Sequence, residues 1–480
     1  MRLRAAEIAA ATGGRLVGPD VPVEGASIDS RDLVPGSLFV PIVDARDGHD
    51  FVGAALERGA AAFLTSRPLD QLVGVAVDDV TAIVVTDPAA ALLALGRAAR
   101  ARLDGPDRPD RSGQAAGPDP SAAVIGITGS VGKTTTKDLL AGVLATTFRT
   151  SASPRSFNNE LGVPLTLVNT PDGTQAVVVE MGARGRGHIA LLCEVARPTV
   201  AVVTTVEMVH TQLFGDLGEV AAAKAELVEA LPPDGAAVLN ADNVLVSAMA
   251  DRTAARVLRF SATGATSAGG ASGPAPDLWV SDVELDDELR PRFRLHSPWG
   301  DADVRLGARG RHNVTNALAA AGAALVAGVP IERVADGLAG AALSALRMDL
   351  RTAPSGARIL NDSYNAGPAS MAAALAALTA LGADRSTAVL GVMAELGDDG
   401  PAEHRAVAEL AAGLGVRVIA VAAPDYGPTV EHAADPQQAL ARLDGAGELG
   451  PGDAVLVKGS RVAGLELLAA ALVGEPATEG

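Results

Sequence analysis

The chain has 480 residues, of which 48% are hydrophobic, 20% charged and 2% aromatic, and its net charge is −18. This length suits about three domains, and the acidic balance argues against a surface that follows the phosphates of a nucleic acid. It does not exclude a bound nucleotide, because one lysine, a metal ion and backbone amides can hold a phosphate locally. The single cysteine, Cys193, excludes an internal disulfide. Since the N-terminus lacks an apolar signal core and the apolar stretch 317–331 is too short for a membrane helix, we expect a cytoplasmic protein.

The first hundred residues predict a small α/β unit. Strands are expected at 37–43 and 82–85, and helices at 51–59 and 89–103. The following segment, DGPDRPDRSGQAAGPDPSAA, is rich in Pro, Gly, Asp and Ser. Such a composition is typical of a flexible linker. We therefore expect a first domain over 1–103 and a linker over 104–123.

Beyond the linker, apolar runs alternate with helical patterns. The runs AAVIGIT, AVVVEMG and TVAVVTTV are typical of a parallel sheet wrapped by helices, which predicts a central domain over 124–344. Within it, the low-complexity segment 261–277 predicts a surface loop insertion. From about Leu346 the runs RILNDSY, TAVLGVMA, VRVIAVAA and DAVLVKG repeat the rhythm, which predicts a doubly wound, Rossmann-like C-terminal domain over 345–480. The expected fold class is α/β with three domains.

The segment GITGSVGKTTTK, residues 126–137, is the strongest local motif. Its glycines let backbone N–H groups face phosphates, Lys133 neutralises the β/γ charge, and the Thr134 hydroxyl can ligate Mg²⁺. Ile127 stands where the generic pattern has its first glycine, so the alternative is an ordinary glycine turn; the Gly-Lys-Thr-Thr run between a strand and a helix favours a nucleotide site. The predicted loop contacts are Thr128, Gly129, Ser130, Val131, Gly132, Lys133, Thr134 and Thr135.

Two further polar residues follow apolar strands. Glu180 ends the run AVVVE, and His210 comes after VAVVTTV. Strand ends are where the sites of parallel sheets form, and a carboxylate there suits Mg²⁺. The alternative interpretation is that Glu180 is a solvated strand-end glutamate and His210 a capping or surface histidine.

Lys224 stands on the apolar face of an expected helix over 219–231. It lies four residues after Val220 and three before Leu227, so its side chain follows the apolar stripe. Burial would shift its amine toward the neutral form. The alternative is that the ammonium reaches solvent; a neutral amine would be available for modification or metal chemistry.

These segments resemble the Mur ligase family over nearly the whole chain. The resemblance rests on TGSVGKTT, on NNELGVPLTL at 158–167, on EMGARGRGHI and on AAAKAEL. It implies that Glu180 and His210 hold Mg²⁺ and that Lys224 is carbamylated and holds a second Mg²⁺. With Lys133, these residues would form the catalytic set.

The same resemblance implies how ATP is held. The stretch GRHNVTNALAAAGA looks like the family's adenine-contacting segment, so Asn313 would contact the nucleotide. Arg347 and Asp362 match the arginine and aspartate that the C-terminal domain brings onto ATP. The C-terminal domain is then expected to close over the site, with hinges at the linker and near 341–346.

Four segments favour one reaction within the family. The stretch 27–42 with DGHDF resembles a uridine-binding N-terminal domain, whereas NDSYNAGPASM and VLVKGSR resemble the member that adds the last peptide unit. The implied substrates are UDP-N-acetylmuramoyl-tripeptide and D-alanyl-D-alanine, joined by a monomer through an acyl phosphate in peptidoglycan synthesis. The residues expected to contact them are Ser27, Asp29, Ser30, Arg31, Asn158, Asn159, Tyr364, Asn365 and Lys458.

The chain departs from the family pattern at three places. Thr205, Glu207 and Val209 replace the asparagine, glycine and alanine that precede the metal histidine; Gly367 replaces an asparagine, and Val392 stands where an acidic residue is common. Two alternatives therefore stay open. One is a sibling amino-acid-adding Mur or folylpolyglutamate-type ligase, and the other is a catalytically degenerate paralogue that binds nucleotide.

Overall fold

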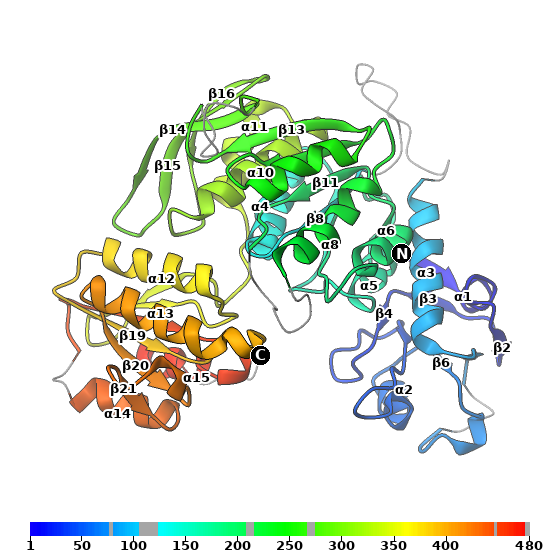
Figure 1. The fold of residues 1–480 in the computed structure, drawn as a ribbon. Helices are drawn as coiled ribbons and strands as arrows, with labels where there is room; N and C mark the ends of the chain where they lie inside the picture. The colour runs from blue at the N-terminus through cyan, green and yellow to red at the C-terminus, as the bar shows by residue number, and fades with distance from the viewer. Residues whose placement is uncertain (76–79, 105–122, 208–215, 266–273, 446–448, 476–480) are drawn as a thin grey trace.

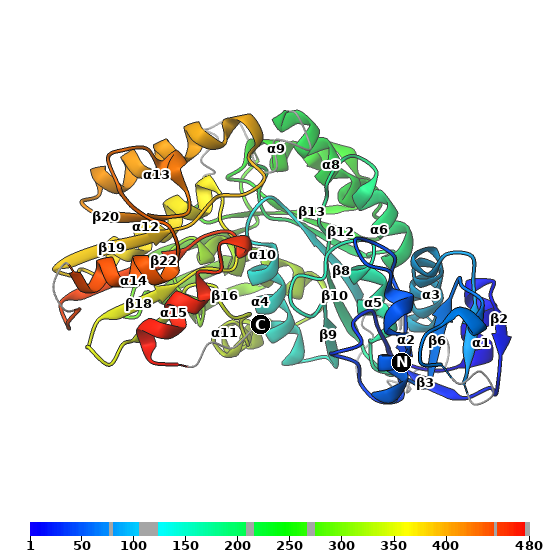
Figure 2. The ribbon, with the colours of Figure 1, turned by 90° about the horizontal axis from the view of Figure 1, so that it is seen from below.

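The computed structural model describes residues 1–75, 80–104, 123–207, 216–265, 274–445 and 449–475. Three regions, each built on its own sheet, follow one another along an arc (Figures 1 and 2). The central region lies between the N-terminal and C-terminal regions. The predicted α/β class is confirmed.

The N-terminal region holds a five-stranded sheet in the order β2-β7-β6-β5-β4, in which only β2 is antiparallel to its neighbour. Its elements are β1 Arg2–Arg4, α1 Ala5–Thr12, β2 Arg15–Val17, β3 Pro22–Glu24, β4 Ala26–Ser27, β5 Leu38–Phe39, η1 Gly48–Phe51, α2 Val52–Glu57, β6 Ala62–Thr65, η2 Leu69–Gln71, β7 Ala82–Val84 and α3 Pro88–Leu103. The strand expected at 37–43 is shorter, since β5 ends two residues before Pro41, which has no N–H for a ladder. Helix α3 begins as expected because Asp87 accepts hydrogen bonds from the backbone N–H groups of Ala89 and Ala90.

The central region is built on a nine-stranded sheet in the order β16-β15-β14-β13-β12-β11-β8-β10-β9. Its elements are β8 Ala123–Thr128, α4 Lys133–Ala145, β9 Thr150–Ala152, α5 Gly162–Val168, β10 Ala176–Glu180, α6 His188–Ala196, β11 Val200–Val203, α8 Leu217–Glu229, β12 Ala236–Asn240, α9 Val244–Ser247, η4 Ala248–Arg252, β13 Arg256–Ser261, β14 Leu278–Leu285, β15 Pro291–Ser297, β16 Gly300–Arg305, α10 Asn313–Val326 and α11 Ile331–Gly340. Strands β8 to β14 pair in parallel as predicted, whereas β14, β15 and β16 form an antiparallel extension that was not predicted. Much of the expected loop insertion, and nearly all of the expected linker, lies outside the described residues.

Alternating side chains of the central strands pack into two cores. Val178 and Val202 face α4, α10 and α11, whereas Val177 and Val203 face α5, α6 and α8. Burial on both faces explains why these strands read as continuous apolar runs.

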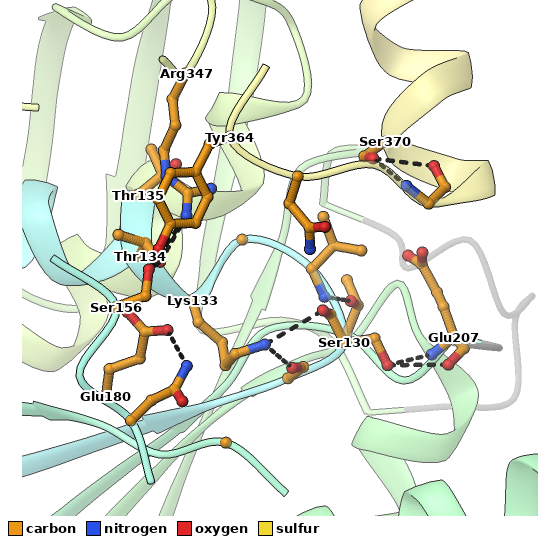
Figure 3. Close-up of a pocket in the computed structure, with 18 of the residues that line it drawn as sticks. Ser130, Lys133, Thr134, Thr135, Ser156, Glu180, Glu207, Arg347, Tyr364 and Ser370 are labelled. Carbon is orange, nitrogen blue, oxygen red and sulfur yellow. Dashed lines mark hydrogen bonds between the residues drawn. The ribbon is translucent and has the colours of Figure 1, made fainter. Parts of the chain in front are cut away.

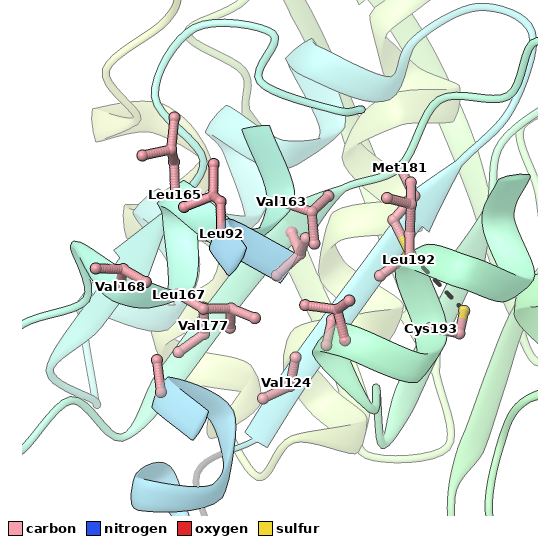
Figure 4. Close-up of a cluster of buried hydrophobic side chains, with 14 of the residues drawn as sticks. Leu92, Val124, Val163, Leu165, Leu167, Val168, Val177, Met181, Leu192 and Cys193 are labelled. Carbon is pink, nitrogen blue, oxygen red and sulfur yellow. Dashed lines mark hydrogen bonds between the residues drawn. The ribbon is translucent and has the colours of Figure 1, made fainter. Parts of the chain in front are cut away.

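Helix α3 joins the N-terminal region to this second core. In Figure 4, Leu92 of α3 lies among Val163, Leu167 and other side chains of the central region. Arg100 of α3 is buried and donates from Nε to the carbonyl of Ala196 at 2.8 Å. The two regions therefore share one continuous hydrophobic cluster.

The C-terminal region has a six-stranded sheet in the order β17-β18-β22-β19-β20-β21, in which the edge strand β17 is antiparallel. Its elements are β17 Asp349–Thr352, β18 Arg358–Asn361, α12 Pro368–Ala380, β19 Arg385–Leu390, η5 Gly397–Asp399, α13 Gly400–Gly413, β20 Arg417–Val421, η6 Pro424–Tyr426, β21 Glu431–Ala433, α14 Pro436–Gly445, β22 Asp453–Lys458, η7 Arg461–Ala463 and α15 Glu466–Val473. Helices α12 and α13 cover one face of the sheet and α14 and α15 the other, as a doubly wound unit requires. None of the described helices is both long and apolar enough to cross a membrane.

Candidate active site

A cavity of about 720 Å³ opens where the central strands end, between the central and C-terminal regions. The central region contributes the turn after β8, the end of β10, α8 and the start of α10. The C-terminal region contributes the segment before β17, the turn after β18, the start of α12 and the end of β22. Both walls are therefore formed by strand ends and helix starts, where α/β sheets place their sites.

The glycine loop forms one end of the cavity. Gly129 and Gly132 have φ values of 147° and 87°, and a Cβ at either position would lie within 2.2 Å of a neighbouring side-chain oxygen, that of Thr204 or Asn316. Only glycine fits such conformations at such approaches. The Thr204 hydroxyl donates to the Val131 carbonyl at 2.6 Å, which ties the loop to the end of β11.

Lys133, the first residue of α4, folds back over this loop (Figure 3). Its Nζ donates to the carbonyls of Gly129 at 2.8 Å and Ser130 at 3.3 Å. Desolvation lowers the pKa of Lys133, the carboxylate of Glu180 opposes that shift, and the guanidinium of Arg347 adds to it. Bonds to neutral carbonyls leave the lysine charge free to meet an anion.

The polar groups around Glu180 suit a hard divalent cation. Glu180 is buried; its Oε1 accepts a hydrogen bond from Asn158 Nδ2 at 2.9 Å, whereas the buried Oε2 has no hydrogen-bond partner in the described structure. The Thr134 hydroxyl lines the same cavity, 3.1 Å from Ser156 Oγ. Carboxylate and hydroxyl oxygens are ligands that Mg²⁺ prefers. An acceptor oxygen left without a donor fits a metal ion held here.

Lys224 projects from α8 into the cavity wall and is 4% exposed. Burial, with a smaller contribution from the charge of Lys133, lowers the pKa of Lys224 from its ordinary 10.5 to about 7. The burial expected from the helical periodicity is confirmed. Near neutral pH much of this amine is uncharged, the form that can react with carbon dioxide.

Asn313 opens α10 at the other side of the loop. Its Nδ2 donates to the Arg309 carbonyl at 2.6 Å, and its Oδ1 accepts from Asn316 Nδ2 at 2.7 Å. Asn313 and Asn316 are both buried and line the cavity beside the glycine loop. The amide network thus fixes the start of α10 against the loop.

The C-terminal wall places Arg347 opposite the loop. Its Nη2 donates to Thr134 Oγ1 at 3.0 Å, and its guanidinium stacks 4.3 Å from the ring centre of Tyr364 (Figure 3). Leu346 and Met348, on either side, have φ values of 62° and 53°, which are strained for non-glycine residues. The backbone on both sides of Arg347 is thus held in a costly conformation that presents its side chain to the nucleotide loop.

The buried Lys458 and the half-buried Asp362 form an ion pair beside the segment that carries Arg347. Lys458 Nζ donates to Asp362 Oδ2 at 2.5 Å and to the Asn365 carbonyl at 2.9 Å, and Asp362 Oδ1 accepts from the backbone N–H of Met348 at 3.1 Å. Lys458 is 2% exposed. The pair therefore fixes both the turn after β18 and the segment that carries Arg347.

The cavity brings together most of the residues predicted for the site. Asn159, Tyr364 and Asn365 line it together with those described above. Thr128 is buried beneath the loop instead. His210 lies outside the described residues, within which no three His, Cys, Asp or Glu side chains gather into a metal-binding group.

The predicted N-terminal contacts do not line this cavity. Ser27 ends β4, and Asp29, Ser30 and Arg31 follow it. Arg31 Nη2 pairs with Asp29 Oδ2 at 2.7 Å. That hydrogen bond lowers the pKa of Asp29. These residues form a separate polar turn in the N-terminal region.

Several cavity residues escaped the sequence analysis or were given no role there. Ser156 touches Thr134, His312 is desolvated and so has a lowered pKa, and Glu207 was noted only as a departure. Asp138 Oδ2 accepts from the backbone N–H of Ser344, which ties α4 to the junction between the two regions. Asp138 could have been found from the sequence, because the run GKTTTKD places it just after the glycine loop. The local spacing of Ser156, His312 and Glu207 gives no such indication.

Known proteins of one family match this chain over nearly its whole length. Residues 127–324 match the family description "Mur ligase middle domain", and residues 346–461 match "Mur ligase, glutamate ligase domain". The chain is 40% identical to a UDP-N-acetylmuramoyl-tripeptide--D-alanyl-D-alanine ligase of Mycobacterium tuberculosis, covering 99% of this chain and 98% of the relative. It is 33% identical to the Escherichia coli protein of that name, covering 96% of each.

Solved structures of the same family have a similar fold. The fold is similar to MurF from Acinetobacter baumannii, with a TM-score of 0.81, 27% identity and 99% of each chain covered. It is also similar to MurF ligase from Thermotoga maritima in complex with ADP, with a TM-score of 0.74, 25% identity, and 94% of this chain and 98% of that chain covered.

Proposed function

The chain belongs to the Mur ligase family, and from that premise we propose that it is the ATP-dependent ligase that adds D-alanyl-D-alanine to UDP-N-acetylmuramoyl-tripeptide. The observation that carries this assignment is the cavity in which the nucleotide loop meets Arg347 and the Asp362–Lys458 pair. The reaction is a step of peptidoglycan precursor synthesis. The near-complete coverage of relatives that bear this activity in their name supports the choice over sibling ligases.

ATP is the nucleotide that we assign to the glycine loop. The backbone N–H groups of the loop and the start of α4 would hold its phosphates, and Lys133 would neutralise the transferred group. Asn313, which lines the cavity at the start of α10, would contact the adenine. We assign Thr134 and Glu180 to a first Mg²⁺, and His210 with a carbamate on Lys224 to a second. Bound Mg²⁺ would supply positive charge to the phosphate oxygens.

In the first half-reaction, positioning of the reactants and electrostatic stabilisation would lower most of the barrier. The tripeptide carboxylate attacks the γ-phosphate in line and gives an acyl phosphate and ADP. Arg347, stacked on Tyr364 and bonded to Thr134, adds positive charge from the C-terminal wall. Closure of that wall excludes water that would hydrolyse the acyl phosphate.

The peptide side of the cavity would be formed by residues from both walls. We assign Asn158, Asn159, Tyr364, Asn365 and Lys458 to substrate contacts or to their support. The uridine diphosphate sugar would bind in the N-terminal region. The residues assigned to it are Ser27, Asp29, Ser30 and Arg31.

Under this assignment, each part of the chain would bind a different ligand or have a different role. Residues 1–103 would hold the sugar nucleotide, 124–344 ATP, and 345–480 the closing wall, with 104–123 as a linker. We also propose that the protein acts as a monomer. A cytoplasmic location is proposed because ATP and nucleotide-linked precursors are made there.

The test is phosphate release by purified protein with ATP, Mg²⁺ and UDP-N-acetylmuramoyl-tripeptide, with and without D-alanyl-D-alanine. Release that depends on both substrates, together with a pentapeptide product by mass spectrometry, is the expected result. Release with a single amino acid instead of the dipeptide would reassign the chain to a sibling ligase. ATP binding without any release would mark a degenerate paralogue.

A further inference from the structure

Glu207 stands beside the nucleotide loop, on the segment that continues β11. Its backbone N–H donates to Ser130 Oγ at 2.9 Å, and the Ser130 hydroxyl is 2.9 Å from the Glu207 carbonyl oxygen. The backbone N–H of Ser130 also donates to the Thr205 carbonyl at 2.8 Å. Glu207 is therefore held at a fixed position relative to the phosphate-binding loop.

The side chain of Glu207 points away from these bonds and lines the cavity. In Figure 3 its carboxylate extends toward the side of the cavity at which Ser370, in the first turn of α12, lies. Its Oε2 is buried and has no hydrogen-bond partner in the described part of the chain. An acceptor in such a position is costly unless a ligand satisfies it.

Four other carboxylates that line this cavity each lie near a cation. Glu180 accepts from Asn158 and faces Lys133, Asp138 pairs with Lys137, Asp362 pairs with Lys458, and Glu160 lies 3.9 Å from Arg184. Glu207 meets no cation among the described residues, and burial raises its pKa despite a hydrogen bond with Thr205. The missing partner is thus a cation or a proton donor brought by a ligand.

The proposed reaction supplies such a group. The amino end of a dipeptide is an ammonium ion at neutral pH, and it must lose a proton before its nitrogen can attack an acyl carbon. Lys133 and Arg347 bring positive charge into the cavity, so a substrate ammonium needs a carboxylate that is not already paired with a cation.

We propose that Glu207 is a catalytic residue that binds the ammonium group of the incoming amine and accepts one of its protons. This inference rests on the proposed ligase function and deepens it. The substrate class that Glu207 selects is a primary amine that arrives charged.

The step balances as follows. The ammonium gives one proton to Glu207, and the freed nitrogen lone pair forms the C–N bond to the acyl carbon. The C–O bond to the phosphate breaks, and its electron pair leaves with the phosphate. The second nitrogen proton passes to the departing phosphate, which yields the amide and hydrogen phosphate.

The test compares two nucleophiles in the full-length protein. Hydroxylamine is already largely neutral at neutral pH and should trap the acyl phosphate as a hydroxamate without a base. D-alanyl-D-alanine needs the base. The variant is Glu207→Gln, which keeps the shape of the side chain, and the matched control is Glu332→Gln, an exposed carboxylate on α11 outside the cavity.

For Glu207→Gln we expect kcat/KM for the dipeptide to fall about a hundredfold, whereas hydroxamate formation with ATP and the UDP-linked tripeptide stays within about twofold of wild type. The retained hydroxamate also shows that the variant is folded. Equal losses with both nucleophiles, or an unchanged dipeptide rate, would overturn the assignment of Glu207 while leaving the ligase function standing. Wild-type protein that forms neither product would overturn the ligase function, and the role of Glu207 with it.

Discussion

The two walls of the cavity differ in whether their charged side chains have partners. On the central wall, Lys133 bonds only neutral carbonyls, Lys224 is desolvated, and Glu180 has an oxygen without a donor among the described residues. On the C-terminal wall, Lys458 and Asp362 satisfy each other. These three charged groups of the central wall are short of partners, whereas the Lys458–Asp362 pair of the C-terminal wall is satisfied.

This difference indicates what each wall contributes. Buried charges without partners cost stability, and a ligand that supplies the partners is bound in return. Paired charges instead fix geometry, here the segment that presents Arg347. Substitutions on the central wall should therefore lower activity at little cost in stability, whereas breaking the pair on the C-terminal wall should lower stability.

The largest effect is expected for Lys133→Ala on the central wall. Removing the lysine leaves the transferred phosphate without its nearest positive charge, so ATP-dependent turnover should fall about a thousandfold. Phosphate release with both substrates measures it, and the thermal midpoint should stay close to that of wild type. A variant that turns over at the normal rate would remove Lys133 from the phosphate site.

The next effect is expected for Lys224→Ala. If the lysine acts through a carbamate, the loss should be about a hundredfold and should be partly reversed by short carboxylates such as acetate or formate. Rescue is measured as phosphate release against carboxylate concentration, with Lys133→Ala as the control that carboxylates do not restore. Full activity of the unrescued variant would contradict this role.

The central wall could be predicted from the sequence because local spacing determines it. The glycine loop, the strand end at Glu180 and the helical face that buries Lys224 are each readable within about a dozen residues. Glu180 ends a strand and Lys224 lies within a helix, and the apolar pattern defines the type of both elements. The fold class followed from the same patterns.

The C-terminal wall could be predicted only in part, because its contacts join distant residues. Asp362 and Lys458 are 96 positions apart, and the contact between Arg347 and Thr134 spans 213. The resemblance placed these residues in the site but not their pairing. Strands β17 and β21 were missed since they are short edge strands with polar residues, and the partner-free carboxylate of Glu207 has no signature in spacing.

A direct test of the contrast compares Asp362→Asn with Glu180→Gln. The first change leaves the ammonium of Lys458 buried without its anion, so the unfolding free energy should fall by about 2 kcal/mol. The second removes an oxygen that has no donor among the described residues and should change that free energy by less than about 0.5 kcal/mol. Urea titration of both variants without nucleotide measures the difference, and equal losses would show that the walls do not differ in this way.

The smallest expected effect concerns the pH dependence of stability on the central wall. The pKa of Lys224 is about 7 in the folded protein and 10.5 ordinarily, so between these values the unfolded chain holds one more proton at this residue than the folded chain. Raising the pH therefore favours the folded state: from pH ~7.5 to ~8.5 the unfolding free energy of wild type should rise about 1 kcal/mol more than that of Lys224→Met.

The measurement is urea unfolding at both pH values, in buffer free of carbon dioxide and nucleotide so that the amine stays unmodified. Because Met removes the desolvated amine, the variant should also be the more stable protein at the lower pH. Parallel pH profiles for the two proteins would mean that Lys224 keeps its charge through a contact with water or an anion. The charged groups of the central wall would then have partners, as those of the Lys458–Asp362 pair do. A small loss of unfolding free energy on substituting central-wall residues would then need another cause.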